Sequence, residues 1–240
     1  MNNETILCAQ GICKCYPKDR SEVPVLRGVN VDIAAGLVTA LVGRSGSGKS
    51  TLMHLLATLD RPDRGEIHFR GERIDNASRA RRDAYRNHEI GIIFQFYHLL
   101  PELSAIENVL APTMIGRSVW SYLRHRKEAR KHAEAMLDRV GLLHRASHKP
   151  SEMSGGEMQR AAIARALMTD PTLLLADEPT GNLDTETGRD ILKLLTELNG
   201  DDGLTIVMIT HDDSIAADAD VCYRMQDGTL EAAPPELQVA

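Results

Sequence analysis

The 240-residue sequence lacks any apolar run close to the roughly 18 to 20 residues that a membrane-spanning helix requires. Its first residues, MNNETILCAQ, lack the basic segment and apolar stretch of a secretory signal, so we expect no secretory leader. Internal repeats and low-complexity tracts are also missing from the sequence. We therefore expect any membrane contact to come only through a partner protein.

Cysteine is scarce, and its spacing fits no common metal site. The four cysteines are Cys8, Cys13, Cys15 and Cys222. Cys13 and Cys15 alternate as residues of a strand do, which places both thiols on one face. Reduced structural thiols are a better interpretation of this pattern than a redox or metal role.

Positive charge is in deficit, because 28 Lys and Arg residues stand against 34 Asp and Glu residues, for a formal net charge of -6. This balance argues against generic nucleic-acid binding. The charge is uneven, since residues 117–149 contain nine Lys and Arg but three Asp and Glu. Within this segment Arg124–Lys131 could lie near anionic headgroups, although a solvated helix face is the simpler interpretation.

Short runs with strand character alternate with helical stretches, which predicts an α/β domain. Residues 173–176 and 206–209 are apolar at every position, as expected for parallel strands covered on both faces. Helical periodicity dominates from about 101 to 149, which predicts a helical lobe inserted into the α/β lobe. The predicted strands are Thr5–Cys13, Gly36–Val42, Glu66–Phe69, Ile90–Phe94, Thr172–Ala176, Thr205–Ile209, Val221–Met225 and Thr229–Glu231.

A phosphate-binding pattern, G-x-x-x-x-G-K-[ST], is matched in full by residues 43–50, which we call the phosphate loop. A predicted strand precedes it and a helical run follows it, as the pattern requires. Glycines let backbone N–H groups surround phosphate oxygens, Lys49 adds a positive charge, and Ser50 offers a hydroxyl to Mg²⁺. The predicted nucleotide-binding residues are Gly43, Arg44, Ser45, Gly46, Ser47, Gly48, Lys49, Ser50 and Thr51.

Two adjacent carboxylates, Asp177 and Glu178, end a predicted buried strand. Ligands of open parallel sheets bind at such strand ends, so we expect both acids beside the phosphate loop. Neighbouring residues of a strand point in opposite directions, which indicates different roles for the two acids. We assign Asp177 to the Mg²⁺ shell and Glu178 to the water that attacks the terminal phosphate.

The segment Ser154-Gly155-Gly156-Glu157 resembles the signature motif of ABC ATPases. The resemblance extends from about Tyr16 to Gly228, and it implies a P-loop NTPase core of ABC type with an antiparallel β subdomain and an inserted α-helical lobe. Residues 1–240 would then form a single ABC ATPase domain. The expected catalytic α/β lobe comprises about 1–95 and 157–232, the helical lobe about 96–156, and the tail 233–240.

Four further residues receive roles from this resemblance alone. Gln95 resembles the glutamine that contacts Mg²⁺ or the attacking water, and His211 resembles the histidine that contacts the γ-phosphate and steadies the catalytic carboxylate. Asp184 resembles the loop aspartate that links one active site to the other. Tyr16 resembles the aromatic residue that stacks on adenine, a contact that needs only a flat face.

The resemblance also implies a homodimer, in which each ATP lies between the phosphate loop of one copy and the signature of the other. Ser154 and two glycines precede a strong helix, whose N-terminus can form a second phosphate site. One domain needs only one phosphate loop, so a second anion-binding helix start is evidence for two copies. The implied cofactors are ATP and Mg²⁺.

The stretches Phe94–Pro101, Ala105–Val109 and Gly181–Asp184 resemble the lipoprotein-releasing and macrolide-efflux branch of the ABC superfamily. In this branch the segment after the glutamine docks integral membrane permease subunits. Phe96–Leu100, which we call the docking segment, is therefore the expected contact, although these residues could instead pack the helical lobe. The resemblance implies a peripheral ATPase on the cytoplasmic face of the inner membrane that powers export or lipoprotein release.

Two alternatives remain at this point. ABC proteins that act on DNA or ribosomes usually have two ATPase units, a long coiled-coil insertion or a zinc site, and the sequence has none of these. Cell-division relatives, which regulate a membrane partner without transport, are not separated from transporters by these motifs. A nucleotide-switch GTPase would carry an N-K-x-D motif, which is missing.

Overall fold

Two β-sheets form the α/β part of the computed structural model, which describes residues 4–18, 21–115 and 119–232. One sheet has six strands in the order β10-β9-β3-β8-β7-β6. All neighbours in it are parallel except β9 and β10, which form an antiparallel hairpin. Its strands are β3 (Val38–Val42), β6 (Ile90–Ile93), β7 (Leu173–Asp177), β8 (Thr205–Thr210), β9 (Val221–Gln226) and β10 (Thr229–Ala232).

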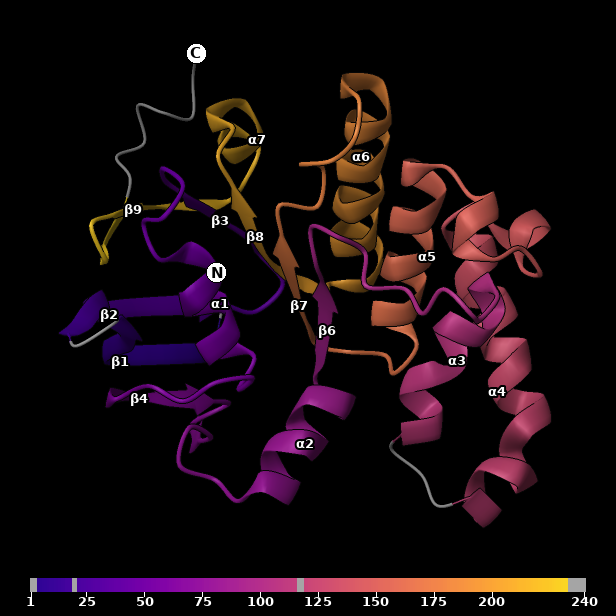
Figure 1. Ribbon diagram of the computed structural model, residues 1–240, viewed down its shortest axis with the longest axis horizontal. Coiled ribbons are helices and arrows are strands. Elements are labelled where there is room, and N and C mark those ends of the chain that lie inside the picture. Colours follow the sequence, from indigo (N-terminus) through magenta and orange to yellow (C-terminus); the bar gives the residue numbers. More distant parts are fainter. Residues whose placement is uncertain (1–3, 19–20, 116–118, 233–240) are drawn as a thin grey trace.

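The second sheet is antiparallel, with the strand order β2-β1-β4-β5, and lies beside the first (Figure 1). Its strands are β1 (Thr5–Lys18), β2 (Ser21–Ala34), β4 (Arg64–Phe69) and β5 (Glu72–Arg73). The predicted end of the first strand at Cys13 is wrong, because β1 stays paired with β2 as far as Lys18. Strand β2 is not among the predicted strands, and its Pro24 is tolerated because β2 is an edge strand.

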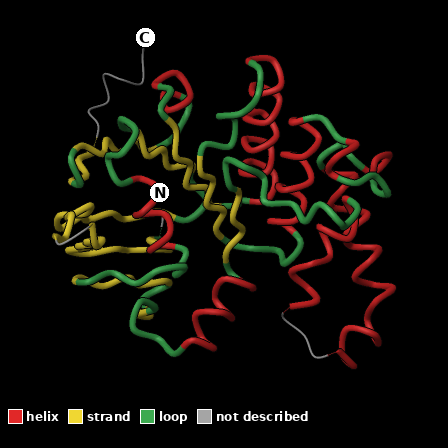
Figure 2. The backbone as a smooth tube through the Cα atoms, in the orientation of Figure 1, coloured by secondary structure: helices red, strands yellow, loops and turns green. Residues whose placement is uncertain are grey.

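Helices cover both faces of the six-stranded sheet, because α1 shares a core with Leu173 and Leu175 of β7, whereas α5 and α6 share one with Leu174 and Ala176. Helices α3, α4 and α5 gather on one side of the view, away from the antiparallel sheet (Figures 1 and 2). None of the helices in the described part of the chain is long and apolar enough to cross a membrane. The helices are α1 (Lys49–Leu56), α2 (Arg79–His88), α3 (Ala105–Ile115), α4 (Val119–Arg139), α5 (Gly155–Leu167), α6 (Thr185–Asp202) and α7 (Asp213–Ala217), with 3-10 turns η1 (Leu143–Arg145) and η2 (Pro150–Glu152).

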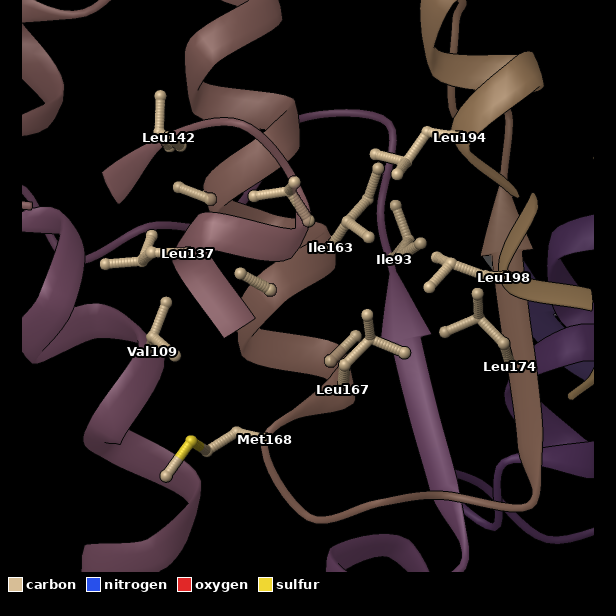
Figure 3. Packing of buried hydrophobic residues seen from close by; sticks show 14 of the residues in the cluster. Ile93, Val109, Leu137, Leu142, Ile163, Leu167, Met168, Leu174, Leu194 and Leu198 are labelled. Carbon is tan, nitrogen blue, oxygen red and sulfur yellow. The ribbon is translucent and has the colours of Figure 1, made fainter. Parts of the chain in front are cut away.

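Helix α5 is the centre of the larger hydrophobic core. Figure 3 shows Ile163 and Leu167 of α5 between side chains of α3, α4 and α6 and of strands β6 and β7. Full burial of one such side chain contributes about 2 kcal/mol. The expected lobe boundary at 156/157 falls inside α5, and this helix packs on the helical elements and on β6 alike.

Candidate functional site

The phosphate loop joins the end of β3 to the start of α1, and two of its glycines are closely packed. A Cβ atom on Gly43 would lie 2.3 Å from the backbone oxygen of Met225. Gly48 has a φ of 110°, and a Cβ there would lie 2.9 Å from the Cδ2 atom of Leu26. Close packing therefore requires glycine at both positions. Arg44, Ser45 and Gly46 are exposed, whereas Ser47 is buried.

The side chain of Lys49 turns back into the phosphate loop. Its Nζ atom donates hydrogen bonds to the backbone oxygens of Gly43 at 2.8 Å and Arg44 at 3.0 Å. Burial lowers the pKa of Lys49, and the carboxylates of Glu178 and Asp177 oppose this shift. A buried ammonium group with little solvent attracts phosphate oxygens more strongly than an exposed one would.

Ser50 and Asp177 meet beside the loop, where Ser50 Oγ donates to Asp177 Oδ1 at 3.3 Å. Burial raises the pKa of Asp177, the Ser50 hydrogen bond lowers it, and the Glu178 charge raises it again. A hydroxyl and a carboxylate are hard oxygen donors of the kind that Mg²⁺ takes when it is shared with substrate phosphates. Among the described residues no three His, Cys, Asp or Glu side chains form a metal-binding group.

Glu178 brings together residues from the ends of three strands. Its Oε2 atom accepts a hydrogen bond from Gln95 Nε2 at 3.3 Å and lies 3.4 Å from His211 Nδ1. Glu178 has a left-handed φ of 44°, and its backbone N–H donates to the backbone oxygen of Ile209 in β8 at 3.1 Å. A non-glycine residue rarely adopts this conformation, so the surrounding strands must hold it in place. Asp177 and Glu178 make separate hydrogen bonds, the first with Ser50 and the second with Gln95.

The loop after Glu178 is tied to Gln95 and ends at Asp184. Asn182 Nδ2, which the sequence analysis did not count as a site residue, donates to the backbone oxygen of Gln95 at 2.8 Å. Asp184 caps α6 by accepting from the N–H and hydroxyl of Thr187 at 3.0 and 2.7 Å, which lowers the pKa of Asp184. Glu178, Asp184 and His211 line one cavity of about 550 Å³.

The signature residues form the N-terminus of α5. Ser154 Oγ accepts from the N–H of Glu157 at 3.2 Å, and Glu157 Oε2 accepts from the N–H of Ser154 at 2.8 Å, which is a capping box. The Ser154 hydroxyl acts only as an acceptor in this cap, so its proton can be donated to a phosphate oxygen. A Cβ on Gly156 would lie 2.5 Å from Thr187 Cγ2 of α6.

The signature and the phosphate loop of one chain are not brought together. In Figure 1, strands β6 and β7 lie between α1, which starts at the phosphate loop, and α5, which starts at the signature. Gly155 instead borders the docking segment and the Asp184 loop, since a Cβ there would lie 3.1 Å from Tyr97 Oη and 3.3 Å from Leu183 Cδ2.

Tyr16 of β1 is held by polar contacts with Asp60, which follows α1, and with Lys14 of its own strand. Its hydroxyl donates to Asp60 Oδ2 at 3.0 Å, and Lys14 Nζ lies 5.2 Å from its ring centre. Burial and Asp60 raise the pKa of Tyr16, whereas a hydrogen bond with Thr51 of α1 lowers it. Lys14 covers one face of the ring. An adenine that stacks here would have to use the other face.

Comparison with protein families gives one match, which covers more than half of the chain. A model described as "ABC transporter" matches residues 26–181. The chain is 74% identical to the lipoprotein-releasing system ATP-binding protein LolD 2 of Rhodopirellula baltica, over 95% of this chain and 89% of that protein. It is 46% identical to the lipoprotein-releasing system ATP-binding protein LolD of Acinetobacter baylyi, over 94% of this chain and 97% of that protein.

Two solved structures have a fold similar to that of this chain. A dimeric post-hydrolysis state of the ATP-binding cassette MJ0796, bound to ADP and Pi, matches with a TM-score of 0.85 and 34% identity, over 95% of this chain and 98% of that one. A second dimeric structure of MJ0796, described as a bacterial ABC transporter cassette, matches with a TM-score of 0.84 and 36% identity, over 94% and 96% of the two chains.

Proposed function

Since this chain belongs to the ABC transporter family as an ATP-binding, ATP-hydrolysing subunit, we propose that it powers lipoprotein release by an ABC complex. In this proposal a homodimer of the chain sits on integral membrane permease subunits at the cytoplasmic face of the inner membrane, as a peripheral protein. The names of the two LolD relatives and their near-complete coverage support this branch over others.

The observation that carries the catalytic part is the contact of Gln95 and His211 with one carboxylate oxygen of Glu178. A carboxylate fixed from two sides can orient a water molecule and accept its proton as the bond to the γ-phosphate forms. His211 is two-thirds exposed, so it is free to approach the γ-phosphate.

The same proposal gives the other site residues their roles. Lys49 and the phosphate loop hold the β- and γ-phosphates, and Tyr16 stacks on adenine. Ser50 and Asp177, with the amide oxygen of Gln95, would hold Mg²⁺. When bound, this ion neutralises charge on the phosphates.

The separation of signature and phosphate loop supports a dimer with shared sites. A nucleotide held at the loop of one copy can meet a second helix N-terminus only if another copy supplies it. Ser154, Gly155, Gly156 and Glu157 would contact the γ-phosphate across the interface, and Asp184 would link the two sites. ATP binding closes this dimer and hydrolysis opens it.

The docking segment has the exposure that a partner contact needs. Phe96 is 68% exposed and Leu100 is 50% exposed, whereas Leu99 packs against the core. Exposed apolar side chains that gather in one short segment can form an interaction surface. We propose that Phe96 and Leu100 contact the permease, at the border between the catalytic lobe (1–95 and 157–232) and the helical lobe (96–156).

Replacing Ser154 with alanine tests the shared site. We expect stability to fall by about 1 kcal/mol, because the helix cap is lost. We also expect kcat for ATP hydrolysis to fall by about tenfold or more, because a hydrogen bond to a charged phosphate is lost. Ser78→Ala is the matched control. Ser78 also caps a helix, because its Oγ atom accepts from the N–H of Arg81 in α2 at 3.3 Å. Equal ATPase rates in both variants would contradict a role for Ser154 beyond capping.

Reconstitution tests the transport function. The membrane protein that co-purifies with the chain is placed in proteoliposomes together with an acylated lipoprotein and the chain. We expect ATP-dependent appearance of the lipoprotein in the aqueous phase, and none with a Glu178→Gln chain. Full ATPase stimulation by the membrane protein without any lipoprotein release would overturn this function and favour a regulatory role.

A further inference from the structure

The side chain of Arg165, near the end of α5, contacts the docking segment through two backbone oxygens. Its Nη2 atom donates to the oxygen of Tyr97 at 2.8 Å, and its Nη1 atom donates to the oxygen of His98. Arg165 is half-buried, and this burial lowers the pKa of its guanidinium. The rigid fork of a guanidinium suits two fixed acceptors of this kind.

The backbone at these two positions needs external support. Tyr97 and His98 have consecutive left-handed φ values of 57° and 48°. Residues with a Cβ atom rarely adopt this conformation, and it persists only where neighbouring groups hold it. The ring of His98 packs edge to face on Phe94 at 4.8 Å, and Tyr97 borders the signature at Gly155. Charge-assisted hydrogen bonds from Arg165 add polar support to these packing contacts.

Tyr97 follows two residues after Gln95, which contacts the proposed catalytic carboxylate of Glu178. Gln95 Nε2 donates to Glu178, and the backbone oxygen of Gln95 accepts from Asn182. A shift of Tyr97 and His98 would therefore move the Gln95 amide relative to Glu178. Helix α5 has the signature at its first turn and Arg165 near its last turn, so one rigid helix contacts both the signature region and the docking segment.

We propose that Arg165 is a positioning residue for ATP hydrolysis. It fixes the backbone of residues 97 and 98 to α5, and this keeps Gln95 in contact with Glu178. Through the same contact, a displacement of the signature helix moves the docking segment, and a displacement of the docking segment by a partner moves Gln95. This inference rests on the proposed roles of Gln95 and Glu178.

Arg165→Lys in the full chain tests the inference, because one ammonium group cannot serve both acceptors with a fixed geometry. We expect kcat to fall by about tenfold, which corresponds to one lost charge-assisted hydrogen bond. The KM for ATP should stay within about twofold, since the phosphate loop is untouched. Hydrogen exchange of the amides in residues 95–100 should accelerate.

The matched control is Arg160→Lys. Arg160 lies on the same helix and also donates to a backbone oxygen, that of Val140 at 3.0 Å, away from the docking segment. We expect the kcat of Arg160→Lys and the amide hydrogen exchange of its residues 95–100 to equal those of the parent. Thermal unfolding of both variants checks that each folds. An equal loss of kcat in both variants would show a general effect on α5 and would overturn the inference.

A double-mutant cycle with Gln95→Ala separates the inference from the proposed function. If Arg165 acts through Gln95, Arg165→Lys should cause no further loss of kcat in the Gln95→Ala background. Losses that multiply would overturn the role of Arg165 and leave that of Gln95 intact. A Gln95→Ala variant with the parental kcat would remove the proposed role of Gln95, and the positioning role of Arg165 with it.

Discussion

Replacing Lys49 with alanine is expected to abolish useful nucleotide binding. The Lys49 ammonium is buried, and its hydrogen bonds to Gly43 and Arg44 hold the phosphate loop closed on itself. The variant loses both of these hydrogen bonds and the positive charge that we propose for the β- and γ-phosphates. Two hydrogen bonds to charged groups together correspond to a loss in affinity of about a hundredfold or more. Isothermal titration with Mg·ATP measures the change directly.

The control for this variant is Lys193→Ala, which removes an equal charge at an exposed position of α6. We expect its affinity for ATP to match that of the parent. Lys49→Arg should also bind weakly, because a planar guanidinium does not fit the space of a buried ammonium. A Lys49→Ala chain that binds ATP within threefold of the parent would show that the phosphate loop is not the nucleotide site.

The parts of the site that the sequence predicts are those where chemistry demands particular residues within a short stretch. The phosphate loop and the Asp177–Glu178 pair are of this kind, and both lie where the strand pattern placed them. The predicted fold class is confirmed by the MJ0796 cassettes and by the two sheets. Strand β2 escaped prediction because Pro24 and Gly28 interrupt its alternation, and its position depends on pairing with β1.

Other features depend on backbone conformation, which leaves no pattern in the sequence. No residue next to Tyr97 indicates a left-handed backbone conformation, since glycine and asparagine, the usual signals, are missing there. The contact of Asn182 with the backbone of Gln95 joins segments 87 residues apart, and its partner is a carbonyl that every residue has. The cation over Tyr16 likewise comes from Lys14, a residue of an alternating strand with no motif of its own.

Replacing Glu178 with glutamine is expected to leave ATP binding intact and to reduce turnover by about a hundredfold or more. Glutamine has the same shape, so its side-chain oxygen can still accept from Gln95 and the strained backbone can be kept. The amide cannot accept the proton of the attacking water, so the chemical step fails after the nucleotide is bound. ATP then stays in the shared site and the dimer remains closed, which light scattering coupled to gel filtration detects.

A second acid separates this effect from a general loss of charge. Glu186 lies in the first turn of α6, where it is exposed, and Glu186→Gln should keep the parental rate and a dimer that reopens after hydrolysis. Adding Ser154→Ala to the Glu178→Gln chain tests where the nucleotide lies. If the trapped dimer then dissociates, each nucleotide lies between the phosphate loop of one copy and the signature of the other. A Glu178→Gln chain that hydrolyses ATP at the parental rate would mean that another group activates the water. In that case the contacts of Gln95 and His211 with Glu178 would serve structure alone.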